Sequence, residues 1–241
     1  VPDTRRFEQA LSAVLGSAPP PAVPPRLAVE DGRLSSIDGV SVRPGRPLGA
    51  ALRETGVRLT PRIASALAVL ARADGLGRVT ALVGETGAAK TSVAALWAAL
   101  TGRRFYKYQA HAGSESSDLT VDIEQDESGE FRKRVKDFYR VLREGRVVID
   151  IDEANIAPWV LWTLEPLLRG ESRVHPIFPE EESFAIGDGV QVVMTFNPAR
   201  YSARSAIDPR IMENSIVAWM DLAAPEDAAR AAEAGVTAIN I

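Results

Sequence analysis

Apolar residues in the middle of the chain follow two patterns that alternate. Short compact apolar runs predict buried strands, and stretches in which apolar residues recur every three or four positions predict amphipathic helices. The expected helices span 61–73, 91–100, 135–143 and 159–168, and the expected strands span 79–83, 105–108, 147–151, 190–195 and 215–220. Because helices connect the parallel strands of such folds, this alternation predicts an α/β domain built on a five-stranded parallel sheet.

The two ends of the chain depart from this alternation. Residues 4–15 predict one short amphipathic helix, and residues 17–25 hold five prolines in nine positions, a composition typical of an extended linker. The steps Asp31-Gly32 and Asp38-Gly39 predict two small hairpins. We therefore expect an N-terminal segment (1–49, with its linker at 17–25), a central domain (50–222) and a short C-terminal helix or domain remnant (223–241).

Composition and charge exclude several classes of protein. The 241 residues contain no cysteine, which excludes disulfides, thiolate zinc sites and thiol chemistry. A net charge of −4 and a pI near 5.4 leave no global basic field for coating nucleic acid. No apolar run approaches the roughly 20 residues of a membrane span, and no apolar leader follows the N-terminus. We expect a cytoplasmic protein with neither a membrane nor a specific nucleic-acid partner.

A glycine-rich segment, Gly84-Glu-Thr-Gly-Ala-Ala-Lys-Thr91, follows the first predicted strand of the central domain. Phosphate binding needs a tight turn that aims backbone N–H groups inward, a helix N-terminus, a lysine for the β- and γ-phosphates and a hydroxyl for Mg²⁺. All of these parts are present. The expected phosphate-binding residues are Gly84, Glu85, Thr86, Gly87, Ala88, Ala89, Lys90, Thr91 and Ser92. Ala89 stands where such loops carry glycine, which requires either a negative φ or a looser site.

Two more predicted strands end in polar side chains. Asp152 and Glu153 follow the run 147–151, and Asn197 follows the run 190–195. Strand C-termini of a parallel sheet line its ligand crevice, so Asp152 would hold Mg²⁺ together with Thr91. Glu153 would orient and deprotonate a water molecule, and Asn197 would reach that water or the γ-phosphate. The alternatives are a strand that ends in solvated acids and an asparagine that caps a turn.

A third acidic residue, Asp150, lies within the predicted strand on the same side as Asp152. We expect its carboxylate to support Asp152 or to pair with an arginine.

The segments GETGAAKT, VVIDIDEANIAP and MTFNP, in this order, resemble those of AAA+ ATPases of the MoxR and dynein-related (midasin-like) branch. Residues 152–158 are similar to the DEINxAP segment of that branch. Ser117-Asp118-Leu119 resembles the start of an insert in its second helix, and 172–187 its hairpin before the sensor strand. The resemblance implies a P-loop NTPase fold, the AAA+ large domain, with a five-stranded parallel sheet flanked by helices, hairpin inserts and a helical lid that is mostly absent.

The resemblance also implies roles for single residues. It places Thr91 and Asp152 at magnesium, Glu153 as the catalytic base and Asn197 as the sensor of the γ-phosphate, with ATP and Mg²⁺ as cofactors.

Members of this family usually carry an arginine finger after the sensor strand, which reaches the γ-phosphate of a neighbouring subunit. The chain has Asn214-Ser215 where an Arg-Phe pair is expected. Arg210 is the preferred substitute, and Arg200 and Arg204 are the alternatives.

By resemblance, we expect a Mg²⁺-dependent ATPase that remodels or matures a protein client. It would act as a subunit of a homo- or hetero-oligomeric ring, a hexamer in many relatives, with a von Willebrand A type protein as a possible partner. Ala89 and the missing Arg-Phe pair motivate an alternative, a catalytically weak nucleotide-binding module that is a structural or regulatory part of a larger AAA+ assembly. A small-molecule kinase with the same phosphate loop is a third hypothesis.

The remaining conspicuous side chains receive structural interpretations. We expect His111 and His175 at the surface, and the aromatic and basic run 105–108 in the sheet rather than on nucleic acid. The tryptophans Trp97, Trp159 and Trp162 are expected in the core.

Overall fold

A five-stranded parallel sheet forms the centre of the molecule. The computed structural model describes residues 24–115, 119, 121–125, 129–174, 183–197 and 207–220. The sheet order is β12 (Ser215–Met220), β4 (Val79–Gly84), β11 (Val190–Phe196), β8 (Val147–Asp152) and β5 (Arg104–Gln109). All four neighbouring pairs are parallel. The predicted α/β fold is confirmed, and each predicted strand end is within one residue of the observed one.

Some predictions concern segments outside the described residues. These are the helix at 4–15, the linker up to residue 23, Ser117, Asp118, His175, Arg200, Arg204 and the C-terminal segment 223–241. Within the described ranges, no helix combines the length and apolar character that crossing a membrane requires.

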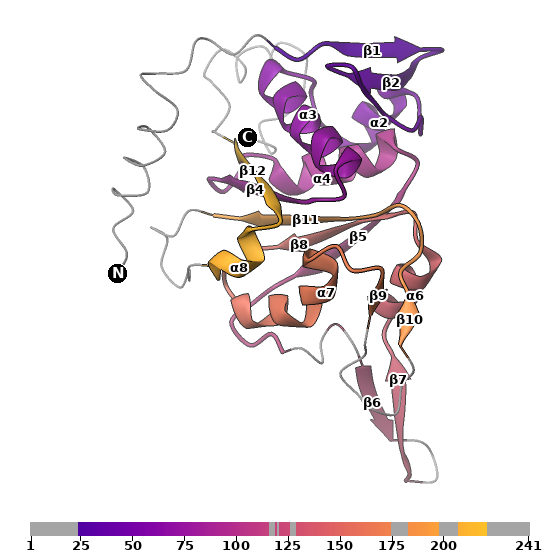
Figure 1. Ribbon diagram of the computed structural model, residues 1–241, viewed down its shortest axis with the longest axis vertical. Helices are drawn as coiled ribbons and strands as arrows, with labels where there is room; N and C mark the ends of the chain where they lie inside the picture. Colours follow the sequence, from indigo (N-terminus) through magenta and orange to yellow (C-terminus); the bar gives the residue numbers. More distant parts are fainter. Residues whose placement is uncertain are drawn as a thin grey trace, which may run out of the picture.

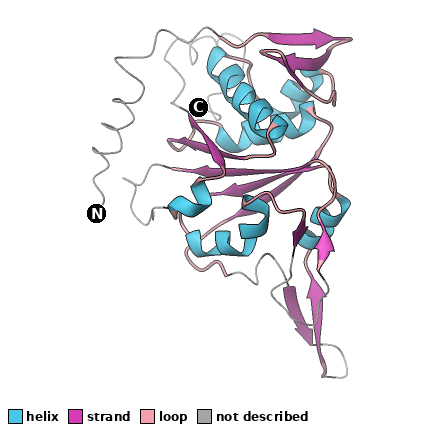
Figure 2. Ribbon diagram, viewed as in Figure 1, coloured by secondary structure: helices cyan, strands magenta, loops and turns pink. Residues whose placement is uncertain are grey.

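Helices cover both faces of the sheet (Figures 1 and 2). One face packs against α2 (Leu48–Thr55), α3 (Pro61–Gly75) and α4 (Lys90–Leu100), and the other packs against α6 (Asp137–Glu144), α7 (Glu165–Leu168) and α8 (Pro209–Met212). Along β8, Val148 is buried with α3 and α4, whereas Val147 and Ile149 are buried on the opposite side. Because side chains alternate along a strand, Asp150 and Asp152 share the α4 face with Val148.

A small three-stranded antiparallel sheet precedes the helices. It consists of β1 (Leu27–Glu30), β2 (Arg33–Ile37) and β3 (Val40–Ser41). The predicted Asp-Gly hairpin turns are confirmed, with all four turn residues at positive φ between 48° and 78°. Leu34, Ile37 and Val42 are buried in the same core as α3 and α4. The described part of segment 1–49 therefore packs onto the central domain, and the domain boundaries stay a prediction.

Two hairpins interrupt the alternation of strands and helices. β6 (Val121–Gln125) and β7 (Phe131–Val135) form an antiparallel pair that projects away from the central sheet (Figure 1). β9 (Arg173–Val174) pairs with β10 (Phe184–Ala185) within the predicted hairpin 172–187. The predicted hairpin inserts are thus present, although residues 175–182 lie outside the described part.

The first of these hairpins corrects one predicted helix. The expected helix 135–143 begins at Asp137 instead, and Val135 is paired with Val121 in the hairpin. The apolar spacing that joined Val135 to the helix does not distinguish it from a strand end, and β-branched valine suits a strand well.

The expected helix 159–168 is also corrected. Residues Pro158–Leu164 form a 3₁₀ helix, and only Glu165–Leu168 are α-helical. Pro166 has no N–H for the carbonyl of Trp162, which instead accepts a hydrogen bond from the backbone N–H of Glu165, in the 3₁₀ spacing.

The tryptophans differ in burial. Trp97 on α4 is 1% exposed, as predicted, but Trp159 and Trp162 are 47% and 39% exposed. Core packing was therefore the wrong prediction for these two, since the tighter 3₁₀ turn does not have the side-chain spacing of an α-helix. His111 is exposed, as predicted.

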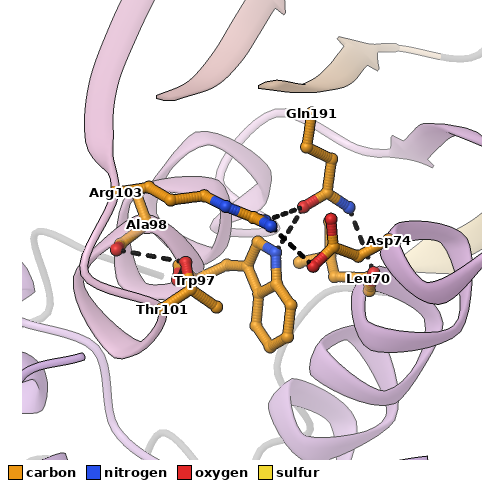
Figure 3. A network of polar contacts seen from close by, with 7 residues as sticks. All are labelled: Leu70, Asp74, Trp97, Ala98, Thr101, Arg103 and Gln191. Atoms are coloured by element: carbon orange, nitrogen blue, oxygen red, sulfur yellow. Dashed lines mark hydrogen bonds and ion pairs between the residues drawn. The ribbon is translucent and has the colours of Figure 1, made fainter. Parts of the chain in front are cut away.

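A buried polar network fixes α4 against the sheet (Figure 3). The indole N–H of Trp97 and the guanidinium of Arg103 both donate to Gln191 Oε1, over 2.6 and 3.0 Å. Arg103 also pairs with Asp74 at the end of α3, and Gln191 Nε2 donates to the carbonyl of Leu70. The network joins α3, α4 and the start of β11. It therefore anchors the helix whose other end carries the glycine-rich loop.

Candidate functional site

The glycine-rich loop connects the C-terminal end of β4 to the N-terminus of α4. Gly84 ends the strand, and a Cβ at this position would lie 2.1 Å from the carbonyl oxygen of Met220 on β12, so only glycine fits. Gly87 has a φ of 87° and Ala89 a φ of 62°. Left-handed residues at a strand-to-helix turn bring successive N–H groups to one side, which is the geometry of an anion-binding loop.

Ala89 takes the left-handed conformation directly before α4. The sequence left open either a negative φ at Ala89 or a looser site. The negative φ is wrong. The backbone keeps the conformation that glycine would adopt, and Ala89 lines the pocket described below.

Replacing Ala89 with glycine is expected to leave the free energy of unfolding unchanged or to raise it by up to about 1.5 kcal/mol. The left-handed conformation costs an L-residue about 1–2 kcal/mol, and glycine loses about 0.4–1 kcal/mol more backbone entropy on folding. The same change at the neighbouring buried Ala88, which has no positive φ, is expected to destabilise by about 1 kcal/mol. Urea denaturation of both variants measures the difference. Equal losses at the two positions would contradict the left-handed conformation of Ala89.

Lys90 is the first residue of α4 and is 9% exposed. Its ammonium donates to the carbonyls of Gly84 and Glu85 over 2.8 and 2.9 Å and to Asn197 Oδ1 over 3.0 Å. The lysine side chain thus folds back over its own loop and reaches the end of β11.

Asp152 ends β8 on the same face of the sheet. Its Oδ1 accepts a hydrogen bond of 2.5 Å from Thr195 Oγ1, and its Oδ2 lies 2.8 Å from Lys107 Nζ. Burial of the carboxyl raises its pKa, but the hydrogen bonds from Lys107, Thr195 and Thr91 outweigh burial, and the pKa of Asp152 is lowered from its ordinary value. The lowered pKa keeps the Asp152 side chain a carboxylate at neutral pH, and Thr91 lines the same pocket.

Glu153 and Asn197 meet across the ends of β8 and β11. Asn197 Nδ2 donates to Glu153 Oε1 over 3.2 Å, and Asn155 Nδ2 donates to the carbonyl of Asn197 over 2.8 Å. Glu153 has a φ of 58°, a left-handed conformation that ends the strand. Asn197 is 3% exposed and lies between the lysine and the glutamate.

These side chains surround one pocket of about 230 Å³. It is lined by Thr86, Gly87, Ala89, Lys90, Thr91, Ser92, Asp152, Glu153, Phe196 and Asn197. The structure thus brings together most of the predicted site residues from three strand ends. Gly84 and Glu85 contribute carbonyls to Lys90, and Ala88 is fully buried beneath the loop, with its carbonyl accepting from Arg62.

Of the two alternatives for Asp150, pairing with an arginine is wrong among the described residues. Its side chain is fully buried, and neither carboxylate oxygen has a hydrogen-bond partner among the described residues. Burial and the neighbouring charge of Asp152 raise the pKa of Asp150 well above its ordinary value. Asp150, in the middle of β8, therefore favours the neutral form more than an exposed aspartate does.

Arg210 lies at the other end of the sheet. In the register of β12 and β4, Ser215 is opposite Val79 and Met220 is opposite Gly84. Because α8 comes directly before Ser215, it lies at the end of the sheet that is remote from the glycine-rich loop. The Arg210 guanidinium donates to both oxygens of Asp208, over 3.1 and 2.8 Å, and stacks on Trp162 at 4.8 Å. It lines a separate cavity of about 470 Å³. Arg210 is thus not brought to the pocket of its own chain.

The donors around Thr91 and Asp152 fit Mg²⁺, which prefers hard oxygen ligands and is usually bound by one or two protein groups together with phosphate oxygens and water. The hydroxyl and the carboxylate line the same pocket. Among the described residues, no group of three or more His, Cys, Asp or Glu side chains is placed to hold a metal. The arrangement therefore suits a metal that arrives with a phosphate ligand.

Several residues of the site were not predicted from the sequence. Thr195 and Lys107 hold the two oxygens of Asp152, and Asn155 holds the backbone of Asn197. For Thr195 and Lys107, the alternation of side chains along a strand offered a signal, because it places both side chains on the same face of the sheet as Asp152. The contact between Asn155 and Asn197 has no local signal, since 42 residues separate them.

Comparison with known proteins gives a consistent picture. The profile of the AAA domain of the dynein-related subfamily matches residues 80–213. A crystal structure of a protein from Cytophaga hutchinsonii, proposed to be an ATPase, matches with a TM-score of 0.54 and 16% identity, over 79% of this chain. The chain spans 55% of the length of that protein, and the likeness shows a shared fold. No curated protein has significant sequence similarity to the chain.

Proposed function

Because the chain belongs to the dynein-related subfamily of AAA domains, which are AAA+ ATPase domains, we propose that its pocket binds ATP with Mg²⁺ and hydrolyses it with Glu153 as the base. One observation carries the proposal: a lysine, a hydroxyl, two carboxylates and an amide from two strand ends and one helix N-terminus line the same pocket. This is the set of groups that phosphoryl transfer to water requires.

Each residue has a role that follows from its place. The loop backbone and Lys90 bind the β- and γ-phosphates, and the ammonium exchanges its carbonyl partners for phosphate oxygens. Thr91 and Asp152 would hold Mg²⁺, which would neutralise charge on the phosphates. Glu153 takes a proton from the attacking water, and Asn197, which donates to Glu153 Oε1, orients the carboxylate and that water.

Beyond hydrolysis, the proposal extends to an assembly. Arg210 lies remote from the pocket of its own chain, as a finger for the pocket of another subunit would. The proposal therefore includes a ring in which Arg210 reaches a neighbour, and in which ATP turnover remodels or matures a protein client. A von Willebrand A type partner and six subunits remain expectations from the family resemblance.

The affinity of wild type and of a Lys90 variant for ATP tests the proposal. Replacing Lys90 with methionine is expected to weaken ATP binding by about 10- to 100-fold, because charge-assisted hydrogen bonds to phosphate contribute about 1.5–3 kcal/mol. Lys136→Met is the matched control, since Lys136 precedes α6 and lies outside the pocket. Calorimetric titration of both variants with ATP and Mg²⁺ measures the effect. Equal affinities of wild type and Lys90→Met would contradict the proposed site.

A second measurement addresses assembly. The mass of the protein in solution, with and without ATP and Mg²⁺, is expected to rise to that of a closed ring when both are present. A protein that binds ATP and stays monomeric under all conditions would contradict the ring.

The geometry of Arg210 also favours the second candidate function, a nucleotide-binding module with little turnover. The guanidinium is held by both oxygens of Asp208 in its own chain, so a neighbour must compete for it. ATP that stays bound without phosphate release in the assembled protein would support this function over hydrolysis.

A further inference from the structure

Lys107 lies on the edge strand β5, beside the two acidic positions of β8. In the parallel register Lys107 is opposite Asp150, and Gln109 is opposite Asp152. Residues opposite each other in neighbouring strands point to the same face, so the lysine side chain lies on the α4 face together with both aspartates. Its Nζ is 2.8 Å from Asp152 Oδ2.

The two partners of this ion pair differ in exposure. The Asp152 side chain is 14% exposed, whereas that of Lys107 is 37% exposed. The carboxylate is also held on its other oxygen by Thr195, so it is fixed from two sides. The lysine sits at the sheet edge on a long flexible stem and is able to swing into solvent without disturbing the core.

Lys107 therefore places one positive charge on the carboxylate proposed to face magnesium. Cations compete for the same oxygen, and a charge in contact with the ligand repels a dication that approaches it. A nucleotide brings several negative charges and further oxygen ligands, which together outweigh one ammonium.

We infer that Lys107 is a resident counter-ion of Asp152 that suppresses metal binding in the nucleotide-free protein and yields when nucleotide is bound. The inference rests on the proposed ATP site and assigns a determinant of metal specificity to that site. It makes binding of the metal conditional on the nucleotide, so that the two enter together.

The same strand offers a matched control. Arg104 pairs with Glu144 at 2.9 Å, and both side chains are about half exposed, at the other end of β5. If Lys107 served only to fix the sheet edge, its loss would resemble the loss of Arg104. A counter-ion role predicts that the loss of Lys107 changes the affinity for the metal and that the loss of Arg104 does not.

The test uses Mn²⁺ as the probe, because its binding is followed directly by electron paramagnetic resonance. Wild type is expected to bind Mn²⁺ at least about tenfold more weakly without nucleotide than with ADP. Lys107→Met is expected to bind Mn²⁺ without nucleotide at least about tenfold more tightly than wild type. Lys107→Arg, which keeps the charge, and Arg104→Met are expected to resemble wild type. Circular dichroism checks that each variant is folded, and Lys107→Gln replaces Lys107→Met if the latter is not.

Two results would overturn the inference: a wild type whose Mn²⁺ affinity is the same with and without ADP, or a folded Lys107→Met that binds Mn²⁺ no more tightly than wild type. The first comparison needs no variant, so the inference stays falsifiable whatever the variants do. A wild type that binds no nucleotide at all would instead contradict the proposed function. Normal ADP binding with unchanged Mn²⁺ affinities would contradict the role of Lys107 alone.

Discussion

Replacing Glu153 with glutamine is expected to lower ATP turnover by about 10²- to 10⁴-fold, the usual contribution of a general base, while ATP affinity changes little. Glutamine has the same size as glutamate and keeps an oxygen that accepts a hydrogen bond. In the wild type, Asn197 Nδ2 donates this bond to Glu153 Oε1 over 3.2 Å. It cannot accept a proton at neutral pH, so the water is positioned but not activated. Phosphate release in single and multiple turnovers, together with calorimetric ATP titration, separates the two effects.

The control for this variant is Glu144→Gln. Glu144 forms an exposed ion pair with Arg104 at the other end of the strands and does not line the pocket. Its loss is expected to leave turnover within about twofold, since exposed ion pairs contribute about 0–1 kcal/mol. A Glu153→Gln protein that hydrolyses ATP at the wild-type rate would remove Glu153 from the mechanism.

Replacing Arg210 with alanine is expected to lower turnover by about 10³-fold or more in the assembled protein, the effect of losing an arginine finger. The nucleotide affinity of the isolated chain should be unchanged, because Arg210 does not line the pocket of its own chain. Arg140→Ala is the matched control, because Arg140 pairs with Asp137 on the exposed side of α6.

A mixing experiment distinguishes a finger supplied in trans from a structural role. Arg210→Ala subunits keep intact pockets, and Glu153→Gln subunits keep an intact Arg210. A mixed ring therefore contains some pockets that have both groups, and partial turnover should return when two inactive proteins are combined. No recovery in rings shown by mass to be mixed would count against Arg210 as the finger.

The local signals that predicted the fold are specific ones. Thr60 before Pro61 predicted the start of α3, and the structure has Thr60 Oγ1 accepting from the N–H of Ile63. The compact run before Gly84 is buried at every position of β4, as a central parallel strand must be. The site was partly predictable because several of its residues come directly after the ends of such strands in the chain.

The errors arose where a neighbour in space overrides a local pattern. Val135 fits a helix by its spacing, but the strand that contains Val121 pairs with it. Trp159 and Trp162 fit an apolar helix face, but the 3₁₀ geometry before Pro166 leaves both half exposed. An ion pair with an arginine was one alternative for Asp150, but in the middle of a central strand its oxygens have no hydrogen-bond partner among the described residues.

By itself, the sequence determined which residues end strands and which helix follows the glycine-rich loop. It thereby determined which lysine, hydroxyl and carboxylates are candidates for binding phosphate and magnesium. These features depend on residues close together in the chain. Only the tertiary structure decided that Lys107 and Thr195 hold Asp152, that Asn197 joins Lys90 to Glu153, and that Arg210 lies outside the pocket of its own chain. The physical reason is that these contacts join strands far apart in sequence, whose order and register are set by the packing of the whole sheet.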